Sequence, residues 1–482
     1  MNFAEVRFWE YLLTGLGVLL GLRLVLGGLR FSRMELFDKL ALLSLGLFLL
    51  LCVSWVTFVI FLLVALGTYV GLAWILKYHA RHARKYLLVL IPLQLLPLLF
   101  YKYADFLLHR VMALDLSALH GWLNQATHAG IPSLHALVIP VGISFYTFQK
   151  VAFVVDTLAF QRPLPRLLDY LNFAGFFPQI VAGPIERRDD LLPQMERFRF
   201  QWSAENLNIG ASWIALGLFF KCCLADNLAA YFNGASTTNP YLVWMASLLF
   251  GLRIYYDFAG YSLVAVGLAR CLGVRLTLNF TSPYCSTSVG EFWRRWHITL
   301  SQWFRDYLYV PLGGGRVRWW ACNVVLVFVV SGIWHGAGWN FVVWGALHGA
   351  LLCGQRLLPK KLKIPPFIGW LCTLLAAIAA WLAFYETNTR ALFAKFRTLL
   401  SPGAYHLSAL RAAPAQWSPP DQFVLACFLL LAVATLLLEW LSLARRNEAY
   451  FYLRRPGVLV LLVMLTVLLA PGKNNGFIYF AF

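Results

Sequence analysis

Long apolar runs follow one another along most of the chain. No Asp, Glu, Lys or Arg occurs between Leu40 and Leu76. A helix needs only about 20 apolar residues to cross the hydrocarbon core of a membrane, so this run predicts two short spans joined by a tight turn. Further apolar segments lie at 11–29, 87–100, 134–155, 205–220, 241–269, 321–352, 367–385, 422–442 and 456–471. Together the lengths predict roughly ten or so spans with additional re-entrant pieces.

Composition agrees with this pattern. Hydrophobic residues make up 60% of the chain, charged residues make up 13%, and the mean hydropathy is +0.68. So little polar surface cannot cover a soluble globule of 482 residues, and the expected fold class is an all-α polytopic membrane protein. The first apolar stretch carries charges at Glu5, Arg7 and Glu10 and no small-residue cleavage site follows it. We therefore expect a retained span there and not a signal peptide.

The basic residues indicate which side of the membrane each loop occupies. The formal net charge is +19, but Lys and Arg occur in short clusters beside apolar runs, which topology explains better than nucleic-acid binding does. Such clusters collect on the cytoplasmic side, which places the N-terminus outside. Anionic lipid headgroups would attract the same clusters. The clusters assigned to the cytoplasm are Arg30, Arg33 and Lys39; Lys77, Arg81, Arg84 and Lys85; Arg316 and Arg318; Lys360, Lys361 and Lys363; and Arg445, Arg446, Arg454 and Arg455.

The segment from Ala321 to Cys353 is expected to return to its own side of the membrane. Basic residues flank it at both ends, and it is shorter than the roughly 40 residues that two complete spans require. The chain should therefore turn at the sequence SGIWHGAGW (331–339), where three glycines permit an irregular backbone. Irregular backbone at that depth must be buried in protein or line a cavity, so His335 is predicted to face a pocket or tunnel.

His335 is a candidate general base. An ionisable group inside a membrane is costly and usually functional, and a neutral imidazole can take a proton from an attacking hydroxyl. On composition alone, a histidine bonded to a carbonyl at a helix contact explains the residue equally well.

The sequence EFWRRWHITLSQWFRDYLYVPLGG (291–314) is typical of a membrane interface, because it mixes aromatic rings with paired charges. Pro311 and the glycines after it are expected to end its helix. His297 lies in this segment, and a catalytic role and an interfacial hydrogen-bonded role remain equally open for it.

Two further clusters carry polar groups in apolar surroundings. Arg253 and Asp257 are one helical turn apart and are expected to pair; a structural pair is favoured over a direct substrate contact. In the sequence FFPQIVAGPIER (176–187), two prolines and a glycine exclude a regular helix. This favours a re-entrant loop that shapes the pocket, with an ordinary interhelical loop as the alternative.

No metal site is predicted. The nine cysteines lie mostly in apolar runs without a CxxC motif, which indicates core thiols and not a disulfide framework or a zinc site. His348 could line the same cavity as His335, but no carboxylate or thiolate spacing supports a metal held by His297, His335 and His348.

These clusters, in this order, resemble the alginate O-acetyltransferase branch of the membrane-bound O-acyltransferase (MBOAT) family. The resemblance covers most of residues 140–350 and the last few residues, whereas the first hundred residues and 390–420 match only in hydropathy. The motifs that carry it are FFPQIVAGPIERRDDLLPQ (176–194), GLFFKCCLADNLA (217–229), YYDFAGYS (255–262), NFTSPYCSTSVGEFWRRWHITLSQWFRDYLYVPLGG (279–314), SGIWHGAGWNFVVWGALHG (331–349) and FIYF (477–480).

The resemblance implies a single integral membrane domain over 1–482, with N-terminal helices in 1–130, a catalytic core in 131–355 and C-terminal helices in 356–482. A ring of helices would surround a thin centre with a funnel and a tunnel. The histidine of the WHG motif carries over to His335 and a second conserved polar position to His297. Candidates for the substrate or tunnel lining are Trp334, Trp339, Trp296, Arg294, Arg295, Asp257, Tyr256, Gln179, Asp306 and His348.

The resemblance also implies acetyl transfer at the inner membrane of a bacterium. Acetyl-CoA would bind at the cytoplasmic face as a substrate, with no bound cofactor, and His335 would act as general base or carry the acyl group transiently. The product would be an O-acetylated extracellular polysaccharide such as alginate, cellulose or peptidoglycan, finished by a separate periplasmic transferase or esterase-like partner. D-alanyl transfer to teichoic acid is the first alternative. A polysaccharide or ion transporter is the alternative from another class, although no cluster is repeated within the chain.

Overall fold

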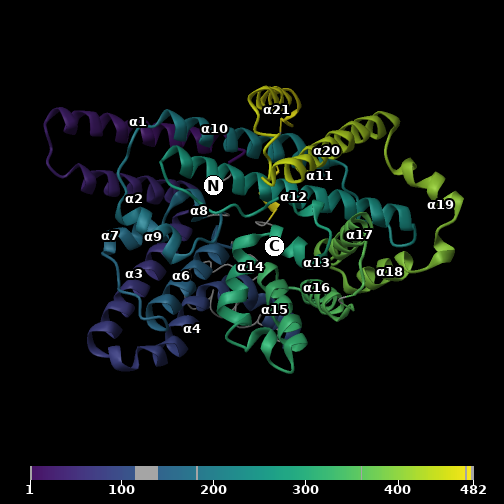
Figure 1. Ribbon diagram of the computed structural model, residues 1–482, viewed down its shortest axis with the longest axis horizontal. Helices are drawn as coiled ribbons and strands as arrows, with labels where there is room; N and C mark the ends of the chain where they lie inside the picture. The colour runs from purple at the N-terminus through teal and green to yellow at the C-terminus, as the bar shows by residue number, and fades with distance from the viewer. Residues whose placement is uncertain (1–2, 114–138, 181–182, 360, 473–474, 479–482) are drawn as a thin grey trace, which may run out of the picture. The chain divides into compact units, whose positions relative to one another are not determined.

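The computed structural model describes residues 3–113, 139–180, 183–359, 361–472 and 475–478. All regular secondary structure in these residues is helical, which confirms the all-α prediction (Figure 1). Residues 479–480 of the FIYF motif, Lys360 and the start of the apolar segment 134–155 lie outside the described residues.

The chain divides into two compact units. Unit 1 contains Arg7–Val181 and Ile185–Phe200, and unit 2 contains Gln201–Phe482 with Asn2–Val6 and Ala182–Pro184. The division expected from the sequence, with breaks at 130 and 355, stays a prediction.

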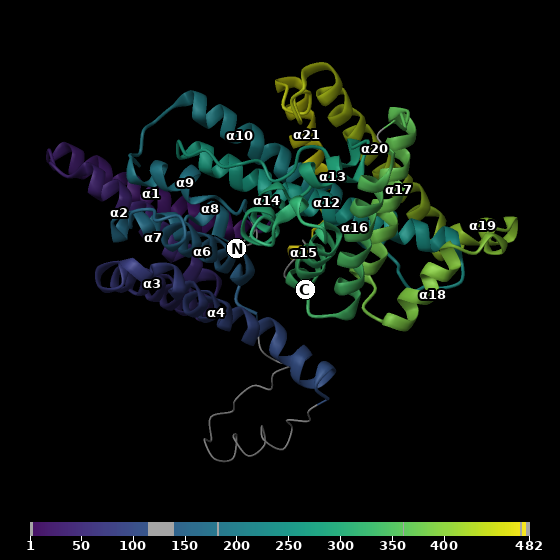
Figure 2. The ribbon, with the colours of Figure 1, turned by 60° about the horizontal axis from the view of Figure 1, so that its bottom comes forward.

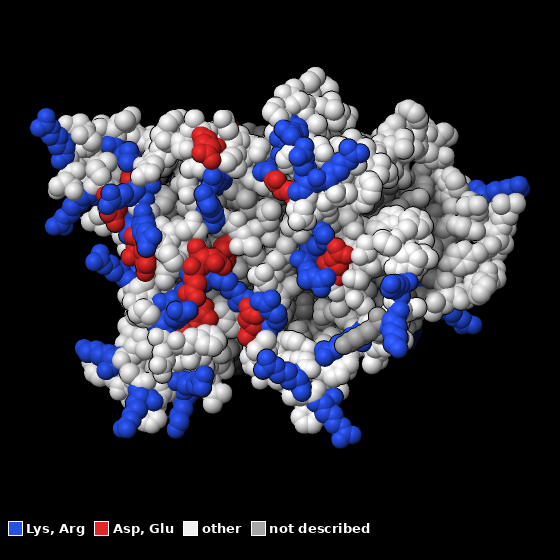
Figure 3. Space-filling model, in the orientation of Figure 1, with Lys and Arg blue, Asp and Glu red and all other residues white. Residues whose placement is uncertain are grey.

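Among the described residues, eight helices are long and apolar enough to cross a membrane, and two apolar helices are shorter. The chain is therefore an integral, multi-pass membrane protein. The eight long helices are Val6–Gly28, Met34–Val53, Trp55–Tyr78, Ala80–Tyr103, Ala204–Ala230, Pro240–Cys271, Pro366–Tyr385 and Pro419–Arg446; the shorter two are Trp320–His335 and Pro456–Leu469. On the face drawn in Figure 3, Lys and Arg form separate small groups between uncharged surface.

The described residues of unit 1 form mainly eight α-helices (Figures 1 and 2). The two spans predicted between Leu40 and Leu76 are confirmed, because the chain breaks at Ser54, whose hydroxyl accepts the Thr57 N–H and caps the second helix. The helices are α1 (Val6–Gly28), α2 (Met34–Val53), α3 (Trp55–Tyr78), α4 (Leu87–Leu98), α6 (Ile143–Leu158), α7 (Leu167–Ala174), α8 (Phe177–Ile180) and α9 (Arg188–Glu196).

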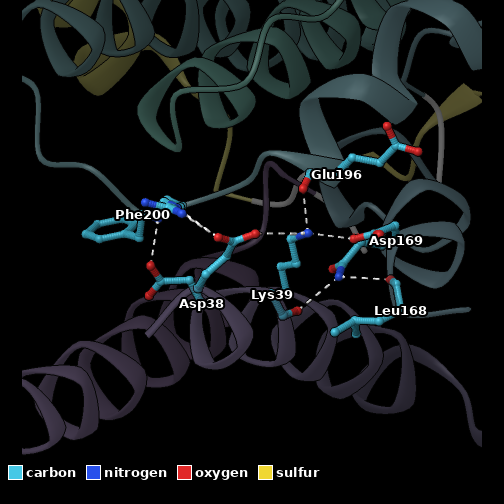
Figure 4. A network of polar contacts seen from close by, with 9 residues as sticks. Asp38, Lys39, Leu168, Asp169, Glu196 and Phe200 are labelled. Atoms are coloured by element: carbon cyan, nitrogen blue, oxygen red, sulfur yellow. Dashed lines mark hydrogen bonds and ion pairs between the residues drawn. The ribbon is translucent and has the colours of Figure 1, made fainter. Parts of the chain in front are cut away.

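A buried ion-pair network connects α2 to α7 and to the end of α9 (Figure 4). Lys39 Nζ lies 2.8 Å from Asp169 Oδ1 and donates to the Glu196 carbonyl oxygen at 2.5 Å, while Asn172 Nδ2 donates to the Lys39 carbonyl at 3.0 Å. Lys39, which the sequence pattern treats as a topological charge, thus also has a structural function within unit 1. The predicted irregular loop is also seen where this region is described, since α8 has only four residues and residues 183–187 are not helical.

Unit 2 contains the remaining α-helices of the described residues. Its longest helix, α12 (Pro240–Cys271), packs closely against α10 (Ala204–Leu218). Reciprocal glycine pairs bring the backbones together: a Cβ added at Gly210 or Gly267, or at Gly217 or Gly260, would lie 2.6–2.7 Å from the carbonyl oxygen of its opposite glycine. Such small-residue contacts are typical of helix packing in membranes. The helices are α10 (Ala204–Leu218), η5 (Phe219–Ala225), α11 (Asp226–Ala230), α12 (Pro240–Cys271), α13 (Val289–Arg295), α14 (Ile298–Phe304), η7 (Arg305–Tyr309), α15 (Trp320–His335), α16 (Trp339–Leu357), α17 (Pro366–Tyr385), α18 (Thr389–Leu399), α19 (Leu407–Ala412), α20 (Pro419–Arg446) and α21 (Pro456–Leu469).

The predicted return hairpin is confirmed as the helix pair α15 and α16, joined by a turn at 336–338. Its depth in the membrane stays a prediction. The helices pack backbone to backbone, because a Cβ at Gly332 would collide with the Phe341 carbonyl and one at Gly345 with the Phe328 carbonyl.

The interfacial segment 291–314 is not one helix. It breaks between α13 and α14 at Trp296 and His297, and the chain continues into the π-helical turn η7. The reason is local, since His297 adopts the left-handed conformation with φ 43°, which no helix can continue through.

Candidate active site

His335 is the last residue of α15 and is buried within unit 2. Its ring centroid lies 5.0 Å from Trp334, 5.0 Å from Trp344 and 5.3 Å from Phe384. The C-terminal end of a helix favours positive charge, so the backbone of α15 would stabilise an imidazolium formed when His335 takes up a proton. The ring is thus covered by protein but is not among the residues that line the pocket described below, so the prediction that it faces a pocket or tunnel stays a prediction.

His297 is held by Asn279 in a defined tautomer. The backbone N–H of Thr299 donates to Asn279 Oδ1 at 3.3 Å, which fixes this atom as the amide oxygen. The same oxygen lies 3.1 Å from His297 Nδ1. Because an amide oxygen can only accept, Nδ1 must carry the proton, and Nε2 is the acceptor nitrogen of the ring.

Burial keeps His297 neutral. The side chain is 1% exposed, and this burial lowers the pKa of His297 to about 3. The left-handed backbone at this position is unusual for a residue with a side chain and occurs mostly at turns and functional sites. A neutral imidazole with a fixed tautomer can position a hydroxyl or accept its proton, but it does not act as a permanent cation.

Aromatic side chains connect the two histidines and reach a third. The Trp334 ring lies 6.1 Å from His297 and 5.0 Å from His335, between centroids. Trp344 lies 5.0 Å from His335 and 4.8 Å from His348. Unit 2 thus brings together four of the candidate residues, His297, Trp334, His335 and His348, and their catalytic or lining functions stay predictions. In the described part of the chain no group of three potential metal ligands forms.

A pocket of about 590 Å³ lies beside this cluster. Its rim carries the exposed guanidinium groups of Arg294, Arg305 and Arg356, and its buried end is formed by Trp293, Val327 and Ser331 among others. Ser331 precedes His335 by one helical turn. The pocket therefore combines a cationic entrance with an apolar interior that leads toward the histidine, an arrangement suited to a substrate with phosphate groups at one end.

The structure corrects the prediction that Asp257 pairs with Arg253. No ion pair joins it to Arg253 within the described ranges; instead Lys221 Nζ lies 2.7 Å from Asp257 Oδ1 and 2.7 Å from Asp226 Oδ1. The expectation was wrong because spacing along one helix reveals only partners on that helix, whereas Lys221 belongs to η5 and Asp257 to α12. We call Lys221, Asp226 and Asp257 the Lys221 cluster.

The Lys221 cluster anchors the chain segment 475–478. Lys221 Nζ donates to the Asn475 carbonyl oxygen at 2.9 Å, and the Ile478 N–H donates to Asp257 Oδ2 at 2.7 Å. Phe477, between them, is buried and its ring lies 4.3 Å from Tyr261. Asp257 therefore has a structural function, as the sequence analysis favoured. Its ionic partner, however, is Lys221 and not Arg253, and it holds segment 475–478 in place.

Four more candidates have structural contacts, and one is exposed. Arg295 pairs with Glu291, Asp306 with its neighbour Arg305, the Tyr256 hydroxyl donates to the Ala432 carbonyl, and Gln179 in unit 1 donates to the Phe173 carbonyl. Trp339 is 52% exposed and is not part of the pocket wall. Their proposed contacts with substrate stay predictions.

Trp296 is fully buried and packs 4.9 Å from Trp381. It supports the turn that carries His297 and does not line the pocket. Sequence reasoning missed Asn279, Trp293 and Trp344. The available signal for Asn279 was its position as the first residue of the motif 279–314, which also contains the turn at His297.

Comparison with known proteins identifies the family. A model of the membrane-bound O-acyltransferase family matches residues 39–385. The chain is 34% identical to a peptidoglycan O-acetyltransferase of Helicobacter pylori, over 60% of this chain and 59% of that protein. It is 32% identical to a probable alginate O-acetylase of Pseudomonas putida, over 80% of this chain and 76% of that protein. It is 31% identical to a teichoic acid D-alanyltransferase of Bacillus subtilis, over 51% of this chain and 66% of that protein.

The matched region includes the α15–α16 hairpin with His335, the turn with His297 and all the residues that line the arginine-rimmed pocket. The chain spans about three fifths of the Helicobacter relative's length, 59%. The family match itself covers well over half of this chain, from Lys39 to Tyr385. The protein therefore belongs to the membrane-bound O-acyltransferase family.

Proposed function

We propose that this protein transfers an acetyl group from a cytoplasmic donor toward a polysaccharide of the bacterial cell envelope. The observation that carries the proposal is the position of His335, buried at the helix end beside a pocket whose rim is cationic. The acetylating relatives of Helicobacter and Pseudomonas support the choice of group and acceptor class.

The donor is acetyl-CoA, bound as a substrate. Its phosphates pair with the guanidinium groups of Arg294, Arg305 and Arg356 at the rim. Its thinner pantetheine arm enters the apolar interior and carries the thioester toward Ser331 and His335. The adenine and phosphates stay in water, because charged groups do not enter hydrocarbon.

His335 acts as the general base. The acceptor hydroxyl gives its proton to the imidazole while its oxygen attacks the thioester carbon. The resulting tetrahedral intermediate collapses with cleavage of the carbon–sulfur bond. The imidazolium then returns the proton to the departing thiolate, so that an ester and a free thiol leave the site. Trp334 and the neutral His297 hold the reactants in line.

The final acceptor is an extracellular polysaccharide of the alginate, cellulose or peptidoglycan type. The protein lies in the inner membrane, and a separate periplasmic transferase or esterase-like protein completes the modification. Only the acyl group has to cross. Deleting the gene in its host and measuring the acetate that mild alkali releases from each envelope polymer identifies the acceptor; unchanged acetate in every polymer would contradict the proposal.

The test of the chemistry uses the purified full chain in nanodiscs with acetyl-CoA labelled in the acetyl group. His335→Ala should lower acetyl release or transfer by about 10²- to 10⁴-fold, the usual contribution of a general base. His406→Ala is the matched control, because His406 is exposed and only caps α19. Equal activity of wild type and His335→Ala would exclude this mechanism. Polysaccharide or ion flux that survives His335→Ala would favour a transporter.

D-alanyl transfer is the second candidate, because the Bacillus relative is named for it. A competition between labelled acetyl and D-alanyl thioesters distinguishes the two. Preference for the D-alanyl donor would replace acetyl as the transferred group but keep the same histidine and pocket.

A further inference from the structure

Four buried nitrogen atoms in one region of unit 2 have no hydrogen-bond partner among the residues that the structure describes. They are both ring nitrogens of His348 and the indole nitrogens of Trp293 and Trp344. All three side chains are at least nine-tenths buried, at 2%, 9% and 0% exposure respectively. Nearly all buried polar groups in native proteins have a partner, so this concentration of unmade hydrogen bonds requires an explanation.

The three side chains are in mutual contact and adjoin the pocket. The His348 ring lies 4.9 Å from Trp293 and 4.8 Å from Trp344, edge to face. Trp293 and Phe328 line the pocket and lie 4.9 Å from one another. His348 is therefore one side chain behind the pocket wall, and a ligand in the pocket would reach it only after rotation of Trp293.

The hydrogen-bonding capacity of these groups selects the ligand chemistry. An indole can only donate, whereas a neutral imidazole donates through one nitrogen and accepts through the other. A secondary amide matches both, since its carbonyl accepts from Trp293 while its N–H donates to His348. A hydrocarbon chain or a simple ester lacks the donor.

The position of the subsite fits an arm that runs inward from the arginine rim. The pocket extends from Arg294, Arg305 and Arg356 to Ser331, one helical turn from His335, and Trp293 lies at this buried end. The pantetheine arm of CoA carries two secondary amides between its phosphates and its thioester. With its phosphates held at the arginine rim and one amide held near Trp293, the arm can carry its thioester only a fixed distance toward His335.

We infer that Trp293 and His348 form an amide-binding subsite for the acyl donor's pantetheine arm, which sets how far the thioester extends toward His335. The inference rests on the proposed function, because it takes the donor to be a CoA thioester. His348 and Trp293 are thus donor-binding residues, distinct from the base that activates the acceptor.

Equilibrium binding to the purified full chain tests the subsite without any acetyl transfer. Three probes are compared: CoA, pantetheine, and adenosine 3′,5′-bisphosphate, which keeps the adenosine and two of the three phosphates of CoA but has no arm. Trp293→Phe keeps an aromatic ring and removes only the N–H. It should weaken CoA and pantetheine about fivefold, the effect of one hydrogen bond, and leave the bisphosphate unchanged. His348→Phe should do the same.

The control is Trp381→Phe, which removes an indole N–H that donates to Tyr284 Oη at 3.1 Å. It should lower the melting temperature and leave the affinity for all three probes unchanged, whereas Trp293→Phe should not lower the melting temperature. In turnover assays, Trp293→Phe should raise the KM for acetyl-CoA and also lower kcat, because the thioester is then less firmly positioned against His335.

Unchanged CoA and pantetheine affinity in both pocket variants would overturn the subsite even if acetyl transfer is observed. A loss of bisphosphate binding would also overturn it, since the substitution would then act on the whole pocket. Failure of the proposed function gives a different result, in which the wild-type chain binds CoA but transfers no acetyl group.

Discussion

Two buried lysines, one in each unit, are stabilised in opposite ways. Lys221 in unit 2 pairs with two carboxylates at 2.7 Å and donates to a backbone carbonyl. Lys150 in α6 of unit 1 is 0% exposed and has no hydrogen-bond partner within the described ranges. Its Nζ lies 4.0 Å from the Phe61 ring centroid and 4.4 Å from that of Tyr146.

The difference shows which buried charges a fold depends on. A cation–π contact contributes about 2 kcal/mol when desolvated, whereas burying an ion costs several kcal/mol. Two aromatic faces therefore do not offset the burial of an ammonium ion, and the environment of Lys150 favours the neutral amine. In the Lys221 cluster, the buried lysine and the two buried carboxylates each need the opposite charge to offset the cost of burial. Lys150, by contrast, resembles a long apolar side chain more than a charged group.

The largest effect is expected for Lys221→Met. The substitution leaves two buried carboxylates without their cation, which should cost about 3–5 kcal/mol of stability. Thermal unfolding and yield of monodisperse protein in detergent measure it. Adding Asp226→Asn and Asp257→Asn to the variant removes the unpaired charges and should restore much of the loss. No restoration would mean that Lys221 acts through its packing and not through its charge.

A smaller loss is expected for Asp257→Asn, about 2 kcal/mol, because the Ile478 N–H loses a charged acceptor while Lys221 keeps Asp226. Segment 475–478 should then detach more often. A cysteine placed at the exposed Gly476 reports this as faster maleimide labelling. The same cysteine in otherwise unchanged protein is the reference, and equal labelling rates would show that the cluster does not hold the segment.

His297 extends the comparison to a basic group whose Nδ1 bonds a neutral amide. Burial lowers the folded-state pKa of His297 to about 3. The stability that the neutral ring contributes to the fold is therefore fully present above the unfolded pKa of roughly 6.5 and is lost as the pH falls toward 3. Between pH 7 and 5.5 this amounts to about 1 kcal/mol. His297→Gln should show a flatter dependence of melting temperature on pH over that range. An unchanged slope would assign the acid sensitivity to other groups.

The smallest effect is expected for Lys150→Met, which should raise stability by up to about 1 kcal/mol because a partnerless amine is replaced by an apolar side chain of similar length. Donor turnover should stay unchanged. A loss of 2 kcal/mol or more would reverse the comparison and show that unit 1, like unit 2, depends on its buried lysine.

Features that depend on neighbouring residues in the sequence were predictable. The break between α2 and α3 and the α15–α16 hairpin follow from run length and from Gly and Ser at the turns. The burial of His335 follows from the same pattern, since irregular backbone inside a membrane must be covered by protein.

Features that depend on contacts between distant helices were not predictable. The ion pair of Asp257 joins two different helical segments, so the local spacing indicated Arg253 instead. The break at His297 depends on Asn279, whose side chain bonds the ring and whose carbonyl accepts the Ile298 N–H at 2.9 Å. Neither the tautomer of His297 nor the unmade hydrogen bonds of His348 can be read from sequence periodicity, because both are properties of the assembled core.

The glycine contacts of the α15–α16 hairpin have a consequence for how relatives of this enzyme can diverge. Since Gly332 and Gly345 leave no room for a methyl group between the two helices, the imidazole at the tip is located by main chain and not by the side chains around it. Pocket residues on the outward sides of the hairpin, such as Val324 and Leu352, are then free to change. Substitutions there should alter the fit of the donor in the pocket while the base stays where it is.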